Sequence, residues 1–317
     1  MTVYTGIDSV PSGFGPSAVT IGKFDGLHQG HRAVLAVLHE RAVARGLVST
    51  VITFDRHPLS LLAPEKCPHA LVSVAQKTEL LTDAGVDAVV VLAFDRALSS
   101  QAPDDFVETV LRRGLDARLV LVGRDFRYGA RGAGNVDTLR AAGERIGFDV
   151  EVIDDVIDDG GVRTSSTAIR ALLDAGRIEE ATRLLGRAPA IRSVVVPGEQ
   201  RGRELGYPTA NLSPDMEGYL PVDGVYAVWA SVDGVRYPGE ISIGNNPTFD
   251  GVPARQAEVH LFDQRIDLYG RTMHVEFVEF VRPMMKFMSV GALIDQLERD
   301  DDEIRAILGI APRPGAA

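Results

Sequence analysis

The order of apolar runs along the chain constrains its fold more than any other feature. Through residue 186, short β-branched runs alternate with amphipathic stretches, a pattern typical of a parallel sheet with helices on both faces. The expected strands are apolar on both faces, as buried parallel strands are, and cover residues 18–22, 48–53, 88–93, 119–122 and 150–153.

Local signals agree with helices between these strands. A helix over residues 31–45 would end at Gly46, Ser73 and Gln76 have the spacing of a capping box, and Pro103 suits a first helical turn. The first part of the chain is therefore expected to be an α/β domain.

The pattern changes near residue 187. Later runs, such as residues 224–230 and 272–281, are separated by Gly, Pro, Asn and Asp, which indicates antiparallel strands in a small barrel or sandwich. One amphipathic stretch over residues 289–308, before Gly309, is expected to be a helix packed on it. We expect two domains, residues 1–186 and 187–317.

Composition excludes several classes of protein. A formal net charge of −11 argues against a nucleic-acid-binding protein. The single cysteine, Cys67, excludes an internal disulfide and a four-thiolate metal site and fits the reducing cytoplasm. No export signal or membrane-spanning run is visible, so neither export nor membrane insertion is expected. The sequence is compatible with a homo-oligomer but does not set an oligomeric state.

The most specific motif runs from Gly22 to His31, in the order GKFDGLHQGH, between the first expected strand and helix. Ligands of open α/β sheets bind at this edge, and a helix N-terminus attracts phosphate. His28 and His31, three residues apart, can both reach one phosphate group. This arrangement suits nucleotidyl transfer, which needs donors that stabilise charge on the phosphates of ATP.

Two other interpretations of this motif stay open. A Gly-rich turn with two surface histidines would have the same residues. A zinc site is disfavoured because no third ligand has a suggestive spacing.

A second polar string runs from Arg163 to Arg170, in the order RTSSTAIR. Ser165, Ser166 and Thr167 lie where a helix should begin, so hydroxyl and N–H groups converge there beside two arginines. An ordinary helix cap is the alternative.

A third motif, from Gly202 to Asn211, ends in Pro-Thr-Ala-Asn. In an extended segment Thr209 and Asn211 point to the same side, where they could present oxygens to Mg²⁺ and an ATP phosphate. Gly198, Gly202 and Gly206 would allow a flap over the phosphates. A turn with solvated Thr and Asn remains the alternative.

These strings and several others occur in the order found in one known family. The string 22–31, with residues 53–58, 122–129 and 163–170, resembles the prokaryotic FAD synthetases, which are bifunctional riboflavin kinase/FMN adenylyltransferases. Residues 202–211, 243–248, 258–260, 267–270 and 282–287 resemble their kinase module. Two departures are Arg56, where proline is common, and Asp125, where some relatives have asparagine.

The resemblance implies roles for residues of the first domain, an α/β nucleotidyltransferase. The ATP phosphates would be held by Gly22, Phe24, Asp25, Gly26, His28, His31, Arg163, Ser166 and Thr167, with the two histidines catalytic. The flavin would contact His57, Asp125, Phe126 and Tyr128.

For the second domain the resemblance implies a riboflavin-kinase-like antiparallel β-barrel with a terminal helix. Thr209 and Asn211 would bind the metal and ATP, and Glu258 would be the base that accepts the proton of the riboflavin 5′-hydroxyl. Flavin contacts would be made by Glu258, Leu268, Tyr269, Gly270 and Arg282. An exposed cross-strand glutamate is the alternative for Glu258.

The implied function is phosphorylation of riboflavin to FMN and adenylylation of FMN to FAD, with ATP and Mg²⁺, in the cytoplasm. Alternatives are an enzyme with one degenerate module, a nucleotidyltransferase for another phosphate ester, and a flavin-binding regulator without turnover. Two other features are given no function: the string Cys67-Pro68-His69 is expected to be a loop, and Asp300 to Glu303 a solvated helix face.

Overall fold

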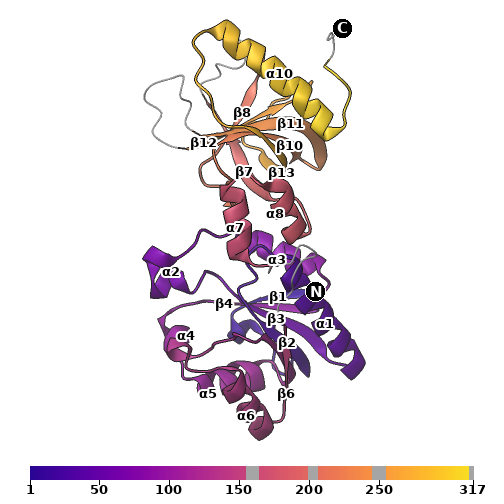
Figure 1. Ribbon diagram of the computed structural model, residues 1–317. Helices are drawn as coiled ribbons and strands as arrows, with labels where there is room; N and C mark the ends of the chain where they lie inside the picture. Colours follow the sequence, from indigo (N-terminus) through magenta and orange to yellow (C-terminus); the bar gives the residue numbers. More distant parts are fainter. Residues whose placement is uncertain (155–163, 199–205, 245–254, 314–317) are drawn as a thin grey trace. The chain divides into compact units, whose positions relative to one another are not determined.

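The computed structural model describes residues 1–154, 164–198, 206–244 and 255–313 (Figure 1). They form two compact units, Met1–Ser166 and Thr167–Ala317. The division lies before the boundary expected near residue 187, because α7 (Ser166–Asp174) and α8 (Ile178–Leu185) belong to the second unit. In that unit the hydroxyl of Tyr219 donates to Asp174 over 2.7 Å.

The first unit is built on a six-stranded sheet in the order β1-β4-β3-β2-β5-β6, and every pair is parallel. The expected α/β fold is confirmed. Its strands are β1 (Thr2–Thr5), β2 (Ser17–Ile21), β3 (Val48–Phe54), β4 (Ala88–Leu92), β5 (Ala117–Gly123) and β6 (Asp149–Ile153). Only the short edge strand β1 was not expected.

Helices cover both faces of this sheet (Figure 1). Its helical elements are η1 (Ile7–Ser9), α1 (Gln29–Arg45), α2 (Leu59–Leu62), η2 (Pro64–Lys66), α3 (Val74–Asp83), α4 (Arg96–Ser100), α5 (Pro103–Phe106), η3 (Val107–Gly114), η4 (Ala130–Gly132) and α6 (Val136–Ile146). The expected caps are present: Gly46 is left-handed after α1, and Ser73 and Gln76 form a complete capping box on α3.

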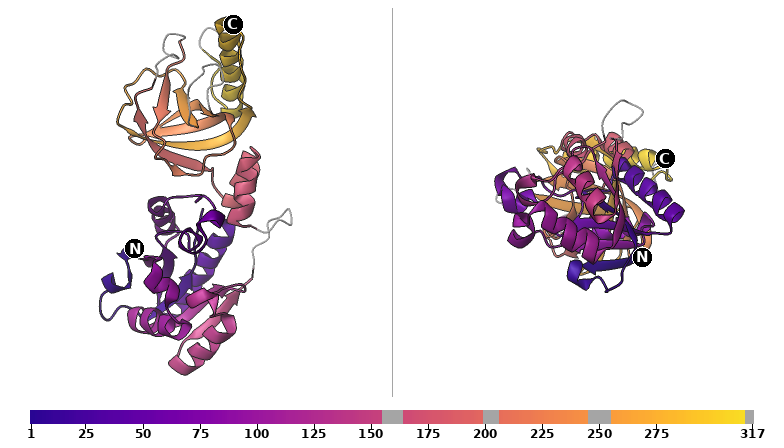
Figure 2. Two further views of the ribbon diagram at one scale, coloured as in Figure 1. Left: turned by 90° about the vertical axis from the view of Figure 1, so that its left-hand side faces the viewer. Right: turned by 90° about the horizontal axis from the view of Figure 1, so that it is seen from below.

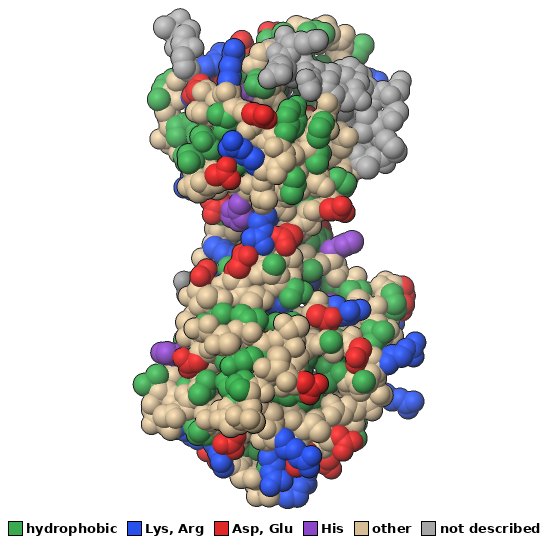
Figure 3. Space-filling model, turned by 180° about the vertical axis from the view of Figure 1, so that it is seen from behind, with side chains coloured by type: hydrophobic (Ala, Val, Ile, Leu, Met, Phe, Trp, Pro, Cys, Tyr) green, Lys and Arg blue, Asp and Glu red, His purple; other side chains and the backbone are tan. Residues whose placement is uncertain are grey.

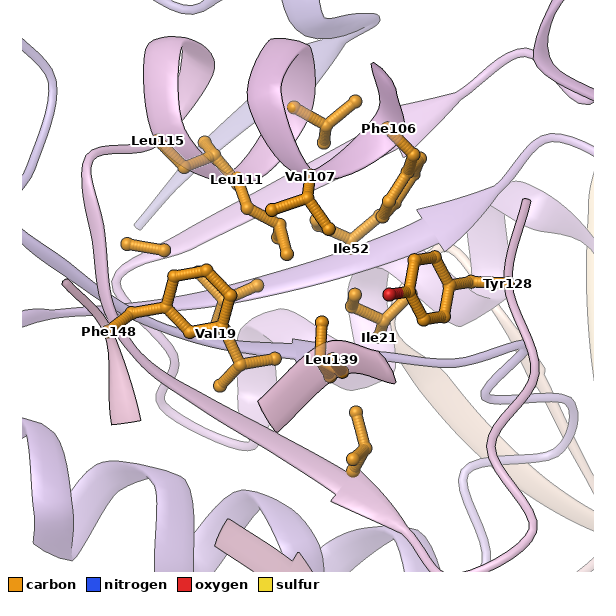
Figure 4. Close-up of a cluster of buried hydrophobic side chains, with 14 of the residues drawn as sticks. Val19, Ile21, Ile52, Phe106, Val107, Leu111, Leu115, Tyr128, Leu139 and Phe148 are labelled. Atoms are coloured by element: carbon orange, nitrogen blue, oxygen red, sulfur yellow. The ribbon is translucent and has the colours of Figure 1, made fainter. Parts of the chain in front are cut away.

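Successive strand residues enter two different hydrophobic clusters. Val19, Ile21 and Ile52 pack with α5, η3 and α6 on one face, where Phe106, Leu111 and Leu139 are also buried (Figure 4). Ala18, Val51 and Val89 pack with α1 and α3 on the other. Because both faces are buried, the central strands carry apolar side chains on both faces, as the sequence predicted.

The second unit is a closed antiparallel barrel. Its strands run in the order β13-β10-β11-β12-β8-β7, and β13 pairs with β7 to close the ring, while the short β9 extends from β7. The expected barrel is confirmed. The strands are β7 (Ala190–Val196), β8 (Thr209–Leu212), β9 (Glu217–Gly218), β10 (Gly224–Val232), β11 (Val235–Gly244), β12 (Gln256–Leu261) and β13 (Thr272–Arg282).

The terminal helix α10 (Val290–Leu308) lies along the outside of the barrel, as Figure 2 shows. It is capped by Ser289 and ends at the left-handed Gly309, so the helix expected over residues 289–308 is confirmed.

One expectation about α10 is wrong. The residues from Asp300 to Glu303 were expected to form a solvated face, but Asp300 is 1% exposed and accepts a bidentate pair from Arg282 of β13, and Asp301 pairs with Arg305. Only Asp302 and Glu303 are exposed. A run of charges shows no helical periodicity of its own, so the sequence did not reveal which side faces the barrel.

The view in Figure 3 shows acidic and basic side chains interspersed over the surface. Among the described residues, no helix is both long enough and apolar enough to cross a bilayer.

Candidate functional site

The first candidate site lies where the strand order of the parallel sheet reverses. From β2 the chain proceeds to β3 and β4 on one side, and β5 and β6 lie on the other. The crevice at the carboxyl ends of such strands is the usual ligand site of open α/β sheets. The motif from Gly22 to His31 follows β2 directly, and the loop of Asp125 and Phe126 follows β5.

The loop after β2 has an unusual backbone. Phe24, Gly26 and Leu27 have positive φ angles of 48°, 82° and 38°. Such angles are uncommon and strained for phenylalanine and leucine. The side chains of Phe24 and Leu27 are only 2% and 0% exposed and belong to the core over α1 and α3. Core packing therefore holds this loop in a shape that it would not adopt alone.

The two motif histidines lie together at the start of α1. His28 is the N-cap, and its Nδ1 accepts a hydrogen bond from the backbone N–H of His31 over 3.4 Å. The rings stack at 3.7 Å between centroids, with 16° between their planes. Since Nδ1 of His28 is an acceptor, Nε2 is the ring nitrogen that carries the proton. The two histidines lie together, and their joint contact with a phosphate group stays a prediction.

Burial sets the charge of His31. Desolvation first, and then the charges of His28, Lys23 and Lys77, lower the pKa of His31 well below its usual value. Its Nδ1 is buried and meets no hydrogen-bond partner among the described residues. At neutral pH the ring is therefore uncharged, and a bound phosphate would favour its protonation.

The Ser/Thr string comes to the same loop from far along the chain. Ser166 Oγ donates to the backbone oxygen of Asp25 over 2.8 Å, and Thr164 is buried beside Gly30. Asp25 Oδ1 in turn accepts from the N–H of Leu71 over 2.8 Å. Thr167 follows Ser166 in α7 and is exposed. Arg163 lies outside the described residues.

The residues expected at the flavin fall into different environments. Asp125 is exposed and Phe126 is half-buried in the loop after β5, while His57 Nδ1 accepts from the N–H of Leu59 over 3.1 Å. Tyr128 is buried in the core, and burial raises the pKa of its hydroxyl. Phe126 stacks on Tyr128 with 5.6 Å between centroids, so Tyr128 supports Phe126 from within the core.

One buried cation at this site was missed by the sequence reasoning. Lys77 of α3 donates to the backbone oxygens of Phe54 and Lys23, at the ends of β3 and β2. Its position just after the capping box was the only signal available in the sequence.

The second candidate site lies on the barrel, where β8 pairs with β12. Asn211 lies opposite Glu258 and Thr209 lies opposite His260, so these side chains share one face. Thr209 Oγ1 donates to Glu258 Oε2 over 3.0 Å. The structure therefore brings together the three polar residues that the sequence assigned to kinase chemistry.

Gly198 and His260 border this group of three polar side chains. A Cβ on Gly198 would overlap the side chain of Asn211, so only glycine leaves room for that amide. His260 Nδ1 lies 2.8 Å from the backbone oxygen of Pro208 and donates to it, and burial lowers the pKa of the ring.

A cavity of about 570 Å³ opens on the other face of the same strands. Ala210 and Val259, which alternate with Thr209 and Glu258, point into it. Leu268 and Tyr269, expected at the flavin, also line it. Its other lining residues are Val195, Gly206, Pro208, Thr209, Leu261, Gln264, Arg265, Ile266 and Asp267.

The remaining expected flavin residues are held in structural contacts. Gly270 donates its N–H to the backbone oxygen of Val195 over 2.9 Å, and Arg282 is paired with Asp300 beneath α10. Asn245 to Thr248 and Gly202 lie outside the described residues. Within the parts of the chain that the structure describes, no three His, Cys, Asp or Glu residues cluster as a metal site.

Comparisons with known proteins cover both units. A family model described as FAD synthetase matches residues 12–168, and one described as riboflavin kinase matches residues 185–308. The bifunctional riboflavin kinase/FMN adenylyltransferase of Escherichia coli K12 is 39% identical over 293 residues, which is 92% of this chain and 93% of that protein. The protein of the same description from Pseudomonas fluorescens is 40% identical over 288 residues, covering 91% and 92%.

A solved structure has the same fold throughout. It is described as a macrolide-efflux protein from Streptococcus pneumoniae, is 31% identical, and covers 96% of this chain and 99% of its own with a TM-score of 0.85.

Proposed function

The chain belongs to the bifunctional riboflavin kinase/FMN adenylyltransferase family, and on that premise we propose which of its residues carry out each reaction. The enzyme phosphorylates riboflavin with ATP to give FMN, and it transfers AMP from ATP to FMN to give FAD and pyrophosphate. The residues matched by the two family models support adenylyl transfer in the first part of the chain and phosphorylation in the second.

In adenylyl transfer, a phosphate oxygen of FMN attacks the α-phosphorus of ATP, and the bond to the bridging oxygen of pyrophosphate breaks. The nucleophile is already an anion, so the protein needs charge-stabilising donors more than a base. We assign this task to Nε2 of His28, to His31, and to the backbone of the Gly22 to Gly26 loop. The stacked histidines at the start of α1 carry this assignment.

Further residues would complete the substrate sites for adenylyl transfer. Ser166 supports the loop through Asp25, and we assign ATP contacts to Thr167 and Arg163 and flavin contacts to His57, Asp125 and Phe126. Tyr128 would act indirectly, by supporting the ring of Phe126.

In the kinase reaction, the 5′-oxygen of riboflavin forms a bond to the γ-phosphorus of ATP, and ADP leaves. The hydroxyl is a poor nucleophile until its proton is taken. We assign the removal of this proton to Glu258, whose Oε2 is oriented by the hydroxyl of Thr209. The contact between these two side chains is the observation that carries the assignment.

Thr209 and Asn211 fit a magnesium site. Their side-chain oxygens are hard donors on one face of β8, and Gly198 leaves the space that Asn211 occupies. Mg²⁺ usually takes few protein ligands together with substrate phosphates. When bound, it would neutralise charge on the ATP phosphates. Asn211→Ala should raise the Mg²⁺ concentration for half-maximal FMN formation and leave FAD formation from FMN unchanged; an unchanged magnesium requirement would contradict the site.

The cavity beside Thr209 is large enough for a substrate ring system. We propose that Leu268 and Tyr269 contact the flavin there, as the sequence suggests, although Glu258 points to the opposite face of the strands. The effect of Leu268→Ala on KM for riboflavin and on KM for ATP distinguishes the flavin from the adenine of ATP as the occupant of the cavity.

We also propose that the enzyme works in the cytoplasm and binds neither nucleic acid nor membrane. The single cysteine and the net charge of −11 support this. Its partners would be riboflavin, FMN and ATP.

A further inference from the structure

Lys77 is a buried lysine that neither reaction uses directly. It lies in α3, its residue is 8% exposed, and its ammonium donates to the backbone oxygen of Phe54 over 2.7 Å and to that of Lys23 over 3.4 Å. Phe54 ends β3, and Lys23 follows β2 within the motif loop. One side chain thus ties together the carboxyl ends of two neighbouring strands, at the edge where the substrates bind.

The surroundings of this lysine disfavour its charged form. Burial lowers the pKa of its ammonium to about 8, against the opposing effect of Asp25 and Asp55. The cation also lies in the first turn of α3, where the helix dipole disfavours positive charge. A residue that breaks local rules in this way usually serves a site.

The ammonium holds the loop next to one of its strained residues. The backbone oxygen of Lys23 also accepts from Thr53 Oγ1 over 3.2 Å. The C=O and N–H of a trans peptide point in opposite directions, so these bonds turn the N–H of Phe24 away from Lys77. Phe24 itself has the positive φ of 48°. Without the clamp, a flip of the Lys23–Phe24 peptide would relieve that strain.

The neighbouring contacts place α3 firmly against the same loop. Asp25 accepts from Leu71 just before α3, and the Ser73 and Gln76 capping box fixes the first turn from which Lys77 extends. The position of the ammonium is therefore determined by the fold on both sides, from the helix and from the two strand ends.

We propose that Lys77 is a positioning residue for adenylyl transfer, which holds the Lys23–Phe24 peptide in the orientation that binds the phosphates of ATP. The inference rests on the proposed ATP site at the Gly22 to His31 loop. It predicts a loss of ATP binding rather than a loss of chemistry once ATP is bound.

The test compares Lys77→Met and Lys77→Arg in the full chain, with Lys66→Met as the control at an exposed lysine. FAD formation is measured at saturating FMN with varied ATP. For Lys77→Met we expect KM for ATP to rise about tenfold or more with a smaller change in kcat, because a misplaced site commonly costs this much. Lys77→Arg keeps the charge and the donors and should recover most of the loss. FMN formation should be unchanged in all three.

A pH profile keeps the proposal testable if Lys77→Met does not fold. The titratable groups around the ammonium are the carboxylates of Asp25 and Asp55 and the uncharged ring of His31. Because its pKa is lowered to about 8, the clamp should weaken as pH rises through that value, since a neutral amine is a poorer donor than an ammonium, and kcat/KM for ATP should fall with it. Arginine does not deprotonate in this range, so Lys77→Arg should lack this alkaline fall.

Different results would contradict the role of Lys77 and the ATP site on which it depends. Lys77→Met with an unchanged KM for ATP, or Lys77→Arg with the same alkaline fall as the natural enzyme, would overturn the role of Lys77. If His28→Ala also left FAD formation unchanged, the ATP site itself would be misplaced.

Discussion

The hydroxyl of Thr209 on β8 donates a hydrogen bond to the carboxylate of Glu258 on β12, over 3.0 Å. The two residues are 49 positions apart in the sequence, and the antiparallel pairing of β8 with β12 brings them together. The contact orients the group to which we assign the proton of riboflavin.

Glu258→Gln should therefore slow FMN formation about 10²- to 10⁴-fold, the usual contribution of a general base. FAD formation from added FMN should stay within about twofold, because it uses the other unit. Glu303→Gln, at an exposed position of α10, is the control. Chromatography of the flavins measures both reactions, and a Glu258→Gln variant with full kinase activity would exclude this glutamate as the base.

Gly198→Ala should also impair the kinase. The new methyl group would overlap the amide of Asn211 and displace it, so we expect kcat/KM for FMN formation to fall about tenfold or more. Gly291→Ala adds the same atom within α10, where its nearest neighbour would be Ser289 Oγ at 4.0 Å, and should have no effect on the kinase. The two variants should therefore differ in kcat/KM for FMN formation. Equal values would show that the position of Asn211 does not matter for the kinase reaction.

Glu240 makes the stability of the second unit depend on pH. Its side chain is buried beneath α10, and Oε2 meets no partner among the described residues. Burial, with Asp300 close by, raises its pKa from 4.5 to about 8. Between these values the folded protein keeps a proton that the unfolded chain has released.

The free energy of unfolding should accordingly fall as pH rises from 4.5 to about 8, by at most about 1.4 kcal/mol per pH unit, and then level off. Urea unfolding followed by the fluorescence of Trp229, the single tryptophan and a residue of β10, measures this at pH 6.5, 7.5 and 8.5. Glu240→Gln should flatten the dependence. Identical slopes in the variant and the natural protein would assign it to other groups.

The cavity on the barrel could hold either the flavin or the adenine of ATP, and a substitution in its lining distinguishes the two. If Leu268 contacts the flavin, Leu268→Ala should raise KM for riboflavin and leave KM for ATP unchanged. An increase in KM for ATP alone would instead place the adenine there. Val235→Ala, at an exposed valine of β11, is the control. No change in either KM would remove the cavity from both substrate sites.

The fold was largely predictable because periodicity and caps act locally. Strands β2 to β6 and helices α1, α3 and α10 lie within a few residues of the expected positions. The division between the two units after Ser166 has no such local signal. Residues 166–185 have the pattern of ordinary amphipathic helices, and nothing local shows that they pack with the second unit.

The site was predictable only where its residues lie in a compact string. His28, His31, Thr209 and Asn211 have recognisable neighbours in sequence. The contacts of Lys77 with Lys23 and of Asp300 with Arg282 join residues that are far apart along the chain, so only the fold reveals them. For the same reason, the sequence did not show that Asp300 and Asp301, within a run of acidic residues in α10, are buried.

The central claim is that one chain carries two separate sites for consecutive reactions, and complementation tests it most directly. His28→Ala should convert riboflavin and ATP to FMN and stop there, while Glu258→Gln should make FAD only from added FMN. His39→Ala, at an exposed histidine of α1, should behave as the natural enzyme. An equal mixture of His28→Ala and Glu258→Gln should form FAD from riboflavin, because FMN released by one is used by the other. No FAD from that mixture, or loss of both reactions in either variant, would contradict the account.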